Sequence, residues 1–276
     1  MCELLPPGQL RRAFADLAFW PWQVGLGLHR VSTFNSLGLA LQLTLYNLLG
    51  IRRLFRLRLY QFEVWIRSGT PDLVVAMESL GSELEIVTRG IAAPDAALII
   101  DAGGYIGTSA IKLATAFPGC RIISIEPSSE NLAVLRRNVA AYANISVVHA
   151  ALAATASGAT LRPAGRGEWG FTIVPASGTG SAIEQVATTT IETLLDEQQA
   201  DRLFVLKLDV EGAELEILQD SRGWMARTDI VIAELHEKLA PGVEGAFAAA
   251  TAGRTNQHLP GEKLLSLRPS IVLASQ

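Results

Sequence analysis

The chain has 276 residues, of which 49% are hydrophobic and 18% are charged, and its formal net charge is −4. This composition supports a packed core and excludes a largely disordered chain. The acidic balance gives no reason to expect a nucleic-acid partner. The two cysteines, Cys2 and Cys120, form no CxxC pair, so neither a disulfide framework nor a zinc site is expected.

The N-terminal segment differs from the rest of the chain in charge. Residues 1–67 contain eight Arg and three acidic residues, whereas the remainder is acidic. A Leu-rich stretch at residues 37–51 alternates as a strand does, yet it also fits one face of a helix, and Leu favours the helix. The stretch is too short to span a bilayer. We expect residues 1–60 to cover the core or a second subunit, with peripheral contact to an anionic membrane as the alternative.

Two further elements are predicted before the main domain. Residues 54–60 and 63–67 alternate apolar and charged side chains, which is typical of a β-hairpin. The sequence Thr-Pro-Asp at 70–72 is typical of a helix start. We therefore predict a helical and β-hairpin extension over residues 1–90 and a catalytic domain over residues 91–276. Since the first residues lack the pattern of a secretion signal, a cytoplasmic location is expected.

After Pro94 the sequence takes on a strand, turn and helix rhythm. Short buried strands are predicted at residues 97–100, 121–125, 146–149, 203–208 and 229–235. This α/β alternation predicts a doubly wound, mostly parallel, Rossmann-like sheet with helices on both faces. Residues 153–187, rich in Ala, Gly, Ser and Thr, are predicted to form loops with one or two short strands.

A glycine-rich turn follows the first strand of this domain. Asp101 ends that strand, and the turn after it carries Gly103, Gly104 and Gly107. Glycines let the backbone turn sharply and approach a ligand closely. Glu126 ends the second strand, where a carboxylate can accept hydrogen bonds from both hydroxyls of a ribose. The alternative is a purely structural turn with a solvated Glu126, but the combination favours a nucleoside-cofactor site.

The residues around the turn favour one nucleoside cofactor over another. The first glycine of a dinucleotide fingerprint is replaced by Ala102, and an acid at the turn is a poor neighbour for a diphosphate. Asp101 suits the positive charge of S-adenosylmethionine instead. Ala151 would admit a flat adenine, and Trp169 either lines the cofactor pocket or anchors a loop. A nicotinamide-dependent oxidoreductase and a non-catalytic cofactor-binding scaffold remain as alternatives.

Charged side chains gather at the carboxyl ends of the last two predicted strands. Lys207, Asp209 and Glu211 alternate, and so do Glu234 and His236. Charges on a buried strand are costly unless they pair or act, so we predict that these five residues are catalytic, with Asp209 or His236 as the base. The alternative is an ion pair that orients a loop. The carboxylates of Asp209, Glu211 and Glu234 and the imidazole of His236 would also suit magnesium or manganese as ligands. Their spacing matches no metal motif, so no metal is predicted.

These residues resemble the FkbM-type S-adenosylmethionine-dependent methyltransferases over residues 64 to 268. The most specific match is Lys-Leu-Asp-Val-Glu-Gly-Ala-Glu at 207–214. Further matches are residues 66–72, 100–107, 125–127 with Asn131, 169–170 and 234–236. The family's turn more often has Asn where this chain has Tyr105.

The resemblance implies methylation of a hydroxyl, often on a sugar or a secondary metabolite, with S-adenosylmethionine as the methyl donor. It does not select the acceptor. The residues predicted to contact the cofactor are Asp101, Gly103, Gly104, Tyr105, Gly107, Glu126, Pro127, Ser128, Asn131, Ala151 and Trp169.

Overall fold

A computed structural model describes residues 42–43, 45–46, 49–164, 170–175, 180–259 and 263–271. The chain divides into two compact units, residues 1–77 and residues 78–276. Among the described residues, no helix is long and apolar enough to cross a membrane. The predicted role of residues 1–60 falls largely outside the described part of the chain.

The first unit contains the predicted hairpin. Strands β1 (Leu54–Leu59) and β2 (Phe62–Arg67) pair in antiparallel register. Leu57, Leu59, Phe62, Val64 and Ile66 share one buried face, while Arg56 and Glu63 on the other face are exposed and form an ion pair with each other. The alternation in the sequence therefore produces the two faces of the hairpin.

Helix α3 (Asp72–Leu80) begins at the predicted Thr-Pro-Asp sequence. The Asp72 backbone N–H donates to Thr70 Oγ1 at 3.3 Å. The fully buried Asp72 carboxylate accepts the Arg67 guanidinium at 2.8 and 2.9 Å, and this pairing offsets the cost of burying the charge. Four described residues of the Leu-rich stretch, 42–43 and 45–46, are helical, in agreement with the preferred prediction.

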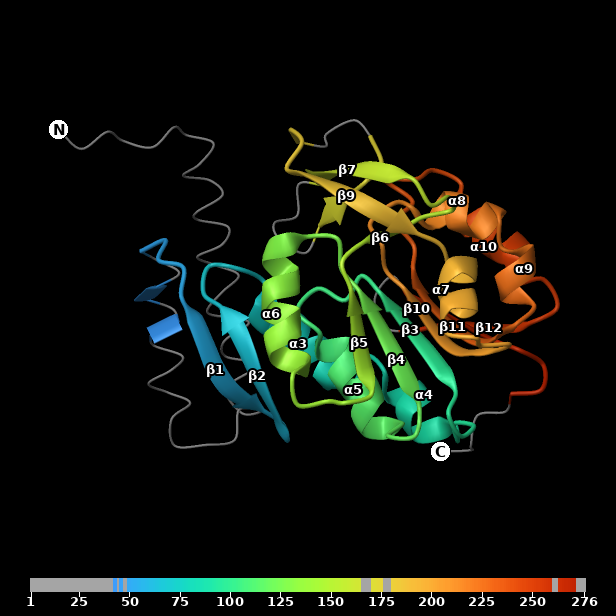
Figure 1. Cartoon of the computed structure of the whole chain (residues 1–276), viewed down its shortest axis with the longest axis horizontal. Coiled ribbons are helices and arrows are strands. Elements are labelled where there is room, and N and C mark those ends of the chain that lie inside the picture. Colours follow the sequence, from blue (N-terminus) through green and yellow to red (C-terminus); the bar gives the residue numbers. More distant parts are fainter. Residues whose placement is uncertain are drawn as a thin grey trace. The chain divides into compact units, whose positions relative to one another are not determined.

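The second unit is built on a seven-stranded sheet (Figure 1). Its strands lie in the order β12 (Thr255–His258), β13 (Lys263–Leu267), β11 (Thr228–Glu234), β10 (Leu203–Leu208), β3 (Leu98–Ala102), β4 (Arg121–Ile125) and β5 (Ile145–Val148). Strand β13 runs antiparallel to both of its neighbours, and the other neighbours pair in parallel. The predicted mostly parallel, Rossmann-like sheet is confirmed. The chain order reverses between β3 and β10, which is where ligands bind in such sheets.

Helices lie on both sides of this sheet. They are α4 (Glu85–Gly90), α5 (Thr108–Ala116), α6 (Ser129–Val139), α7 (Ile191–Glu197), α8 (Glu214–Gln219), α9 (Arg222–Met225) and α10 (Val243–Ala250). Figure 1 shows α5 and α6 on one side of the sheet and α7 to α10 on the other. Strands β3 and β10 are buried along their whole length between these layers, in keeping with their mostly apolar sequences, and each buries one charged residue, Asp101 and Lys207.

A small second sheet departs from the prediction for residues 153–187. Its order is β6 (Ala151–Leu152), β9 (Glu184–Thr189), β7 (Gly158–Pro163) and β8 (Phe171–Thr172). The prediction of loops with one or two short strands was therefore wrong. These segments are short and poor in alternating apolar residues, and their pairing depends on partners distant in sequence, so local propensity does not reveal them.

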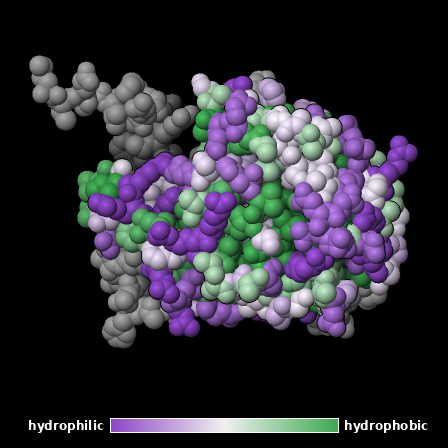
Figure 2. Space-filling view, in the orientation of Figure 1, coloured by the Kyte–Doolittle hydropathy of each residue, from purple (hydrophilic) through white to green (hydrophobic). Residues whose placement is uncertain are grey.

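The edge of the main sheet reaches the surface at β5. Three of its four residues are half-buried, whereas the central strand β3 is buried throughout. Figure 2 shows hydrophobic residues gathered over the central sheet on this face, with hydrophilic residues around them.

Candidate active site at the carboxyl edge of the sheet

The glycine turn packs tightly against both neighbouring strands. Gly103 has a φ of +80°, and a Cβ at this position would lie 1.8 Å from the backbone oxygen of Asp209. A Cβ on Gly104 would lie 2.3 Å from Ser124 Oγ. The N–H groups of both glycines donate to the Ile125 carbonyl, at 3.1 and 2.8 Å. Only glycine fits at either position, so the turn presents bare backbone.

Glu126 organises the residues around this turn. Its Oε2 accepts the Tyr105 backbone N–H at 2.9 Å. Its Oε1 accepts the Ser128 N–H at 2.9 Å and the Asn131 side-chain amide at 3.3 Å. The structure thus brings together four residues that the sequence predicted, and Glu126 is held in a single orientation by donors from both sides.

Asp101 lies beneath the turn and is fully buried. It accepts a hydrogen bond from Ser124 Oγ at 2.9 Å, and its Oδ1 lies 3.7 Å from Lys207 Nζ. Burial raises the pKa of Asp101, and Lys207 offsets this in part. The nearest cation to Asp101 among the described residues is thus Lys207, and its predicted contact with the cofactor stays a prediction.

Lys207 joins the turn to the acidic residues after β10. Its Nζ lies 3.1 Å from Asp209 Oδ2 and 3.4 Å from the Gly103 carbonyl oxygen. Burial alone would lower the pKa of Lys207, but Asp209 and Asp101 outweigh it and raise that pKa. Conversely, burial would raise the pKa of Asp209, but Lys207 and His236 outweigh it, so Asp209 is a carboxylate at neutral pH.

His236 is held by Glu214, a residue to which the sequence assigned no role. His236 Nδ1 lies 2.7 Å from Glu214 Oε1, and Glu214 is fully buried. Glu214 also accepts the Val210 N–H at 3.1 Å and the Gly212 N–H at 2.7 Å. Glu214 therefore fixes both the imidazole and the loop after β10. Its place in the first turn of α8, within the matching stretch 207–214, was the available signal.

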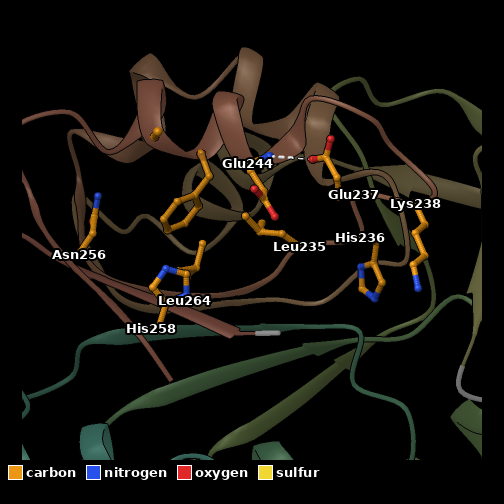
Figure 3. Close-up of a pocket in the computed structure, with 10 residues that line it drawn as sticks. Leu235, His236, Glu237, Lys238, Glu244, Asn256, His258 and Leu264 are labelled. Carbon is orange, nitrogen blue, oxygen red and sulfur yellow. Dashed lines mark hydrogen bonds between the residues drawn. The ribbon is translucent and has the colours of Figure 1, made fainter. Parts of the chain in front are cut away.

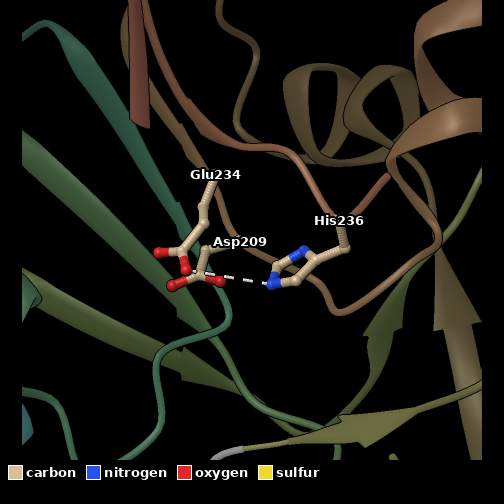
Figure 4. Close-up of side chains that lie close together, drawn as sticks. All are labelled: Asp209, Glu234 and His236. Carbon is tan, nitrogen blue, oxygen red and sulfur yellow. Dashed lines mark ion pairs between the residues drawn. The ribbon is translucent and has the colours of Figure 1, made fainter. Parts of the chain in front are cut away.

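The other ring nitrogen of His236 faces two carboxylates. Nε2 lies 3.4 Å from Glu211 Oε2 and 3.9 Å from Glu234 Oε1, and Figure 4 shows His236 pointing toward Glu234 and Asp209. Burial would lower the pKa of His236, but the surrounding carboxylates, with Glu214 first, raise it to about 9. A protonated imidazole has no free lone pair, so Asp209 is the better base of the two predicted candidates.

Glu211 reaches this cluster by a different path from the one predicted. The alternation of Lys207, Asp209 and Glu211 assumed a continuous strand, but β10 ends at Leu208. The chain then turns, and Glu211 has a φ of +52°. Glu211 therefore approaches His236 from a loop.

Lys263 and Glu83 extend the cluster, and neither was predicted. Lys263 Nζ lies 2.9 Å from Glu234 Oε2 and 3.8 Å from Glu83 Oε1. Lys263 stands opposite Glu234 because β13 pairs antiparallel with β11. That register depends on the folded sheet, so no local pattern in the sequence indicated it.

The remaining residues predicted to contact the cofactor are Gly107, Pro127, Ala151 and Trp169. Gly107 precedes the first residue of α5 with a φ of +85°. Ala151 is buried in β6, and Pro127 is half-buried directly after Glu126. Trp169 lies outside the described residues.

A cavity of about 500 Å³ adjoins His236 (Figure 3). Figure 3 shows His236 at one end and His258 at the other, with Leu235 and Leu264 between them. Phe247 of α10 also lines the cavity. His236 thus belongs both to the charged cluster and to this cavity.

A model of the methyltransferase FkbM domain matches residues 101–252, which hold the turn and all of the charged cluster except Glu83 and Lys263. The chain belongs to the FkbM methyltransferase family. It is an S-adenosylmethionine-dependent methyltransferase, as the sequence resemblance implied, and S-adenosylmethionine is its cofactor.

The FkbM chain is also similar to solved methyltransferase structures. An S-adenosylmethionine-dependent methyltransferase from Agrobacterium tumefaciens has a TM-score of 0.42 and 10% identity, covering 79% of this chain and 70% of that chain. An rRNA methylase from Streptococcus thermophilus has a TM-score of 0.39 and 8% identity, covering 70% and 95%. A precorrin-6y C5,15-methyltransferase from Geobacter metallireducens has a TM-score of 0.39 and 12% identity, covering 67% and 89%. A search of curated proteins found no match.

Proposed function

We propose that this chain is an O-methyltransferase that transfers a methyl group from S-adenosylmethionine to a hydroxyl of a small molecule, a sugar or a secondary metabolite. One observation carries the proposal. Gly103 of the turn touches the backbone of Asp209, and Lys207 bonds to both residues. A carboxylate suited to an acceptor hydroxyl therefore lies directly beside the turn that binds the methyl donor.

The residues around the turn fit S-adenosylmethionine, which supplies a methyl group already activated on a sulfonium. The bare backbone at Gly103 and Gly104 permits close approach of a ligand. The Glu126 carboxylate, oriented by Tyr105 and Ser128, is the group assigned to the ribose hydroxyls. Asn131 supports Glu126 from helix α6.

The chain's contribution to the reaction is alignment and proton transfer. Asp209 accepts a hydrogen bond from the acceptor hydroxyl and takes its proton as the new C–O bond forms. Lys207 holds Asp209 in place, and Glu214 holds His236. Alignment of the acceptor oxygen with the methyl group contributes about 7–11 kcal/mol in well-oriented systems.

The cavity beside His236 is the proposed acceptor site. Leu235, Phe247 and Leu264 give it apolar walls, and Asn256 and His258 add polar groups at its far end (Figure 3). Binding sites for small molecules combine apolar walls with a few polar groups in this manner. The lining suits a ring-shaped acceptor that has apolar faces and several hydroxyls.

Methyl transfer from isotope-labelled S-adenosylmethionine to a panel of sugars and hydroxylated metabolites tests the proposal. NMR of the product identifies the atom that carries the new methyl group. We expect an O-methyl product with the parent enzyme and with the exposed-site control Glu216→Gln. A product methylated only on nitrogen or carbon contradicts O-methylation.

A further inference from the structure

We propose that Asp209, Glu234 and His236 form a binding site for one divalent cation of the magnesium or manganese class. One ligand atom from each side chain lies within 4.8 Å of the other two (Figure 4). The three residues come from the carboxyl ends of the adjacent strands β10 and β11. The inference rests on the proposed function for its role in catalysis, but binding itself is tested without any acceptor.

The environment of His236 Nε2 is the second observation. The side chain is 1% exposed, and among the described residues this atom makes no hydrogen bond. A buried polar atom without a hydrogen bond is unfavourable, so such atoms in folded proteins often mark a site for a ligand. Nε2 lies 3.4 Å from Glu211 Oε2 and 3.9 Å from Glu234 Oε1. The longer distance, to Glu234, leaves room for an ion shared by Nε2 and that oxygen.

The opposite side of the imidazole has the partner that metal-binding histidines require. Nδ1 lies 2.7 Å from Glu214 Oε1, and Glu214 is itself oriented by two backbone N–H groups. A histidine that ligates a metal almost always donates its other N–H to such a group, which fixes the ring and directs the free nitrogen toward the ion. Ligation requires the neutral ring, so cation binding displaces a proton from His236.

The two carboxylates keep oxygens for a cation although each has a lysine partner. Lys207 contacts Asp209 through Oδ2, and Lys263 contacts Glu234 through Oε2, so the second oxygen of each carboxylate remains. Oxygen ligands with one imidazole and no thiolate suit a hard cation. A cation held by these three side chains would keep open coordination positions for the acceptor oxygen, whose pKa it would lower. Asp209 would then bind the cation through one carboxylate oxygen and accept the proton of the acceptor hydroxyl through the other.

Manganese titration of the full-length, chelator-treated protein, followed by EPR, tests the site. We expect one saturable Mn²⁺ per chain, displaced by Mg²⁺, and nitrogen modulation from an imidazole in pulsed spectra. Asp209→Asn and Glu234→Gln should each weaken binding by about 10-fold or more, and His236→Gln should also abolish the nitrogen modulation. The matched control is Glu216→Gln, which changes an exposed residue outside the cluster.

The outcomes separate this inference from the proposed function. Asp209 and Glu234 are 27% and 21% exposed, so their isosteric variants are expected to fold even if His236→Gln does not. No saturable Mn²⁺ binding, or equal binding by ligand and control variants, overturns the cation site. Full methyl transfer in chelator does the same while leaving the proposed function intact. Specific Mn²⁺ binding without transfer to any hydroxyl supports the site and rejects the proposed function.

Discussion

The glycine turn, residues 101–107 with Glu126, and the charged cluster around His236 differ in what determines their structure. In the turn, glycines set the backbone, and the Glu126 carboxylate accepts donors from Tyr105, Ser128 and Asn131. In the cluster, carboxylates crowd around one imidazole whose Nε2 makes no hydrogen bond among the described residues. In the first region, the backbone conformation and the orientation of Glu126 are fixed by hydrogen bonds. The second concentrates buried titratable groups with shifted pKa values, which is typical of a site that performs chemistry.

The two regions meet where the turn packs against Lys207 and Asp209. Gly103 touches Asp209, and Lys207 bonds to both residues. Substitutions in the turn should therefore weaken cofactor binding, and substitutions in the charged cluster should reduce turnover. A substitution that changes both quantities equally would contradict this division.

Gly103→Ala should have the largest effect. The new Cβ would lie 1.8 Å from the Asp209 backbone oxygen, at a φ of +80° that alanine rarely adopts. Strain and overpacking together predict a loss of about 3 kcal/mol or more in the free energy of unfolding, with loss of S-adenosylmethionine binding. Denaturant unfolding and calorimetry measure the two effects.

Gly245→Ala is the matched control. Gly245 lies inside α10, and a Cβ added there would have no neighbouring atom within 4 Å. This substitution should raise the free energy of unfolding by about 0.5–1 kcal/mol through helix propensity. If both glycine variants behave alike, the turn does not have the tight packing described above.

Asp209→Asn should come next, and it should act on turnover alone. Loss of the proposed base is expected to reduce kcat by about 10²–10⁴-fold, while cofactor affinity stays within a few-fold. Steady-state kinetics and calorimetry with S-adenosylhomocysteine test this, with Glu216→Gln as the control. An equal loss of cofactor binding would place Asp209 in the turn region instead.

The difference between the two regions also explains how much the sequence predicted. Strands β3, β4, β5, β10 and β11 are apolar runs whose carboxyl ends share one edge in any parallel sheet, so Asp101, Glu126, Asp209 and His236 were expected at that edge. Edge strand β12 has the polar sequence Thr-Asn-Gln-His and β13 is antiparallel, so neither followed from this reasoning.

Partners and charge states were harder to predict than positions. Lys263 reaches Glu234 through the register of β13, and Glu214 reaches His236 across the loop that starts α8. Both contacts exist only in the folded sheet. The raised pKa of His236 follows from them, and for this reason the sequence left Asp209 and His236 as equal candidates for the base.

Glu214→Gln should test the support of the charged cluster. Both oxygens of Glu214 accept N–H donors, so an amide places its own N–H group against a donor. We expect a loss of about 1–3 kcal/mol in the free energy of unfolding and reduced turnover, since the loop and His236 both lose their anchor. Glu216→Gln, an exposed site on the same helix, should change stability by less than about 0.5 kcal/mol. Equal stability of the two variants would contradict the conclusion that Glu214 anchors His236 and the loop after β10.

Glu126→Gln is the corresponding change on the binding side. It should weaken S-adenosylhomocysteine binding by about 1–3 kcal/mol, because the amide nitrogen cannot accept the hydrogen bonds that each oxygen now accepts. The kcat at saturating cofactor should change little. Calorimetry and saturation kinetics check these outcomes, and a large fall in kcat without weaker binding would contradict the division into two regions.

His258→Gln should have the smallest effect, and it should be confined to the acceptor. His258 is exposed and lines the end of the cavity opposite His236 (Figure 3). A polar group at that distance from the charged cluster can contribute recognition but no chemistry. Losing one hydrogen bond there is worth about 0.5–1.5 kcal/mol, which corresponds to a few-fold rise in KM for the acceptor. The kcat and the affinity for S-adenosylhomocysteine should be unchanged. A fall in kcat with constant KM would mean that the reacting hydroxyl lies at the His258 end, and the acceptor would then have to bind in the opposite direction.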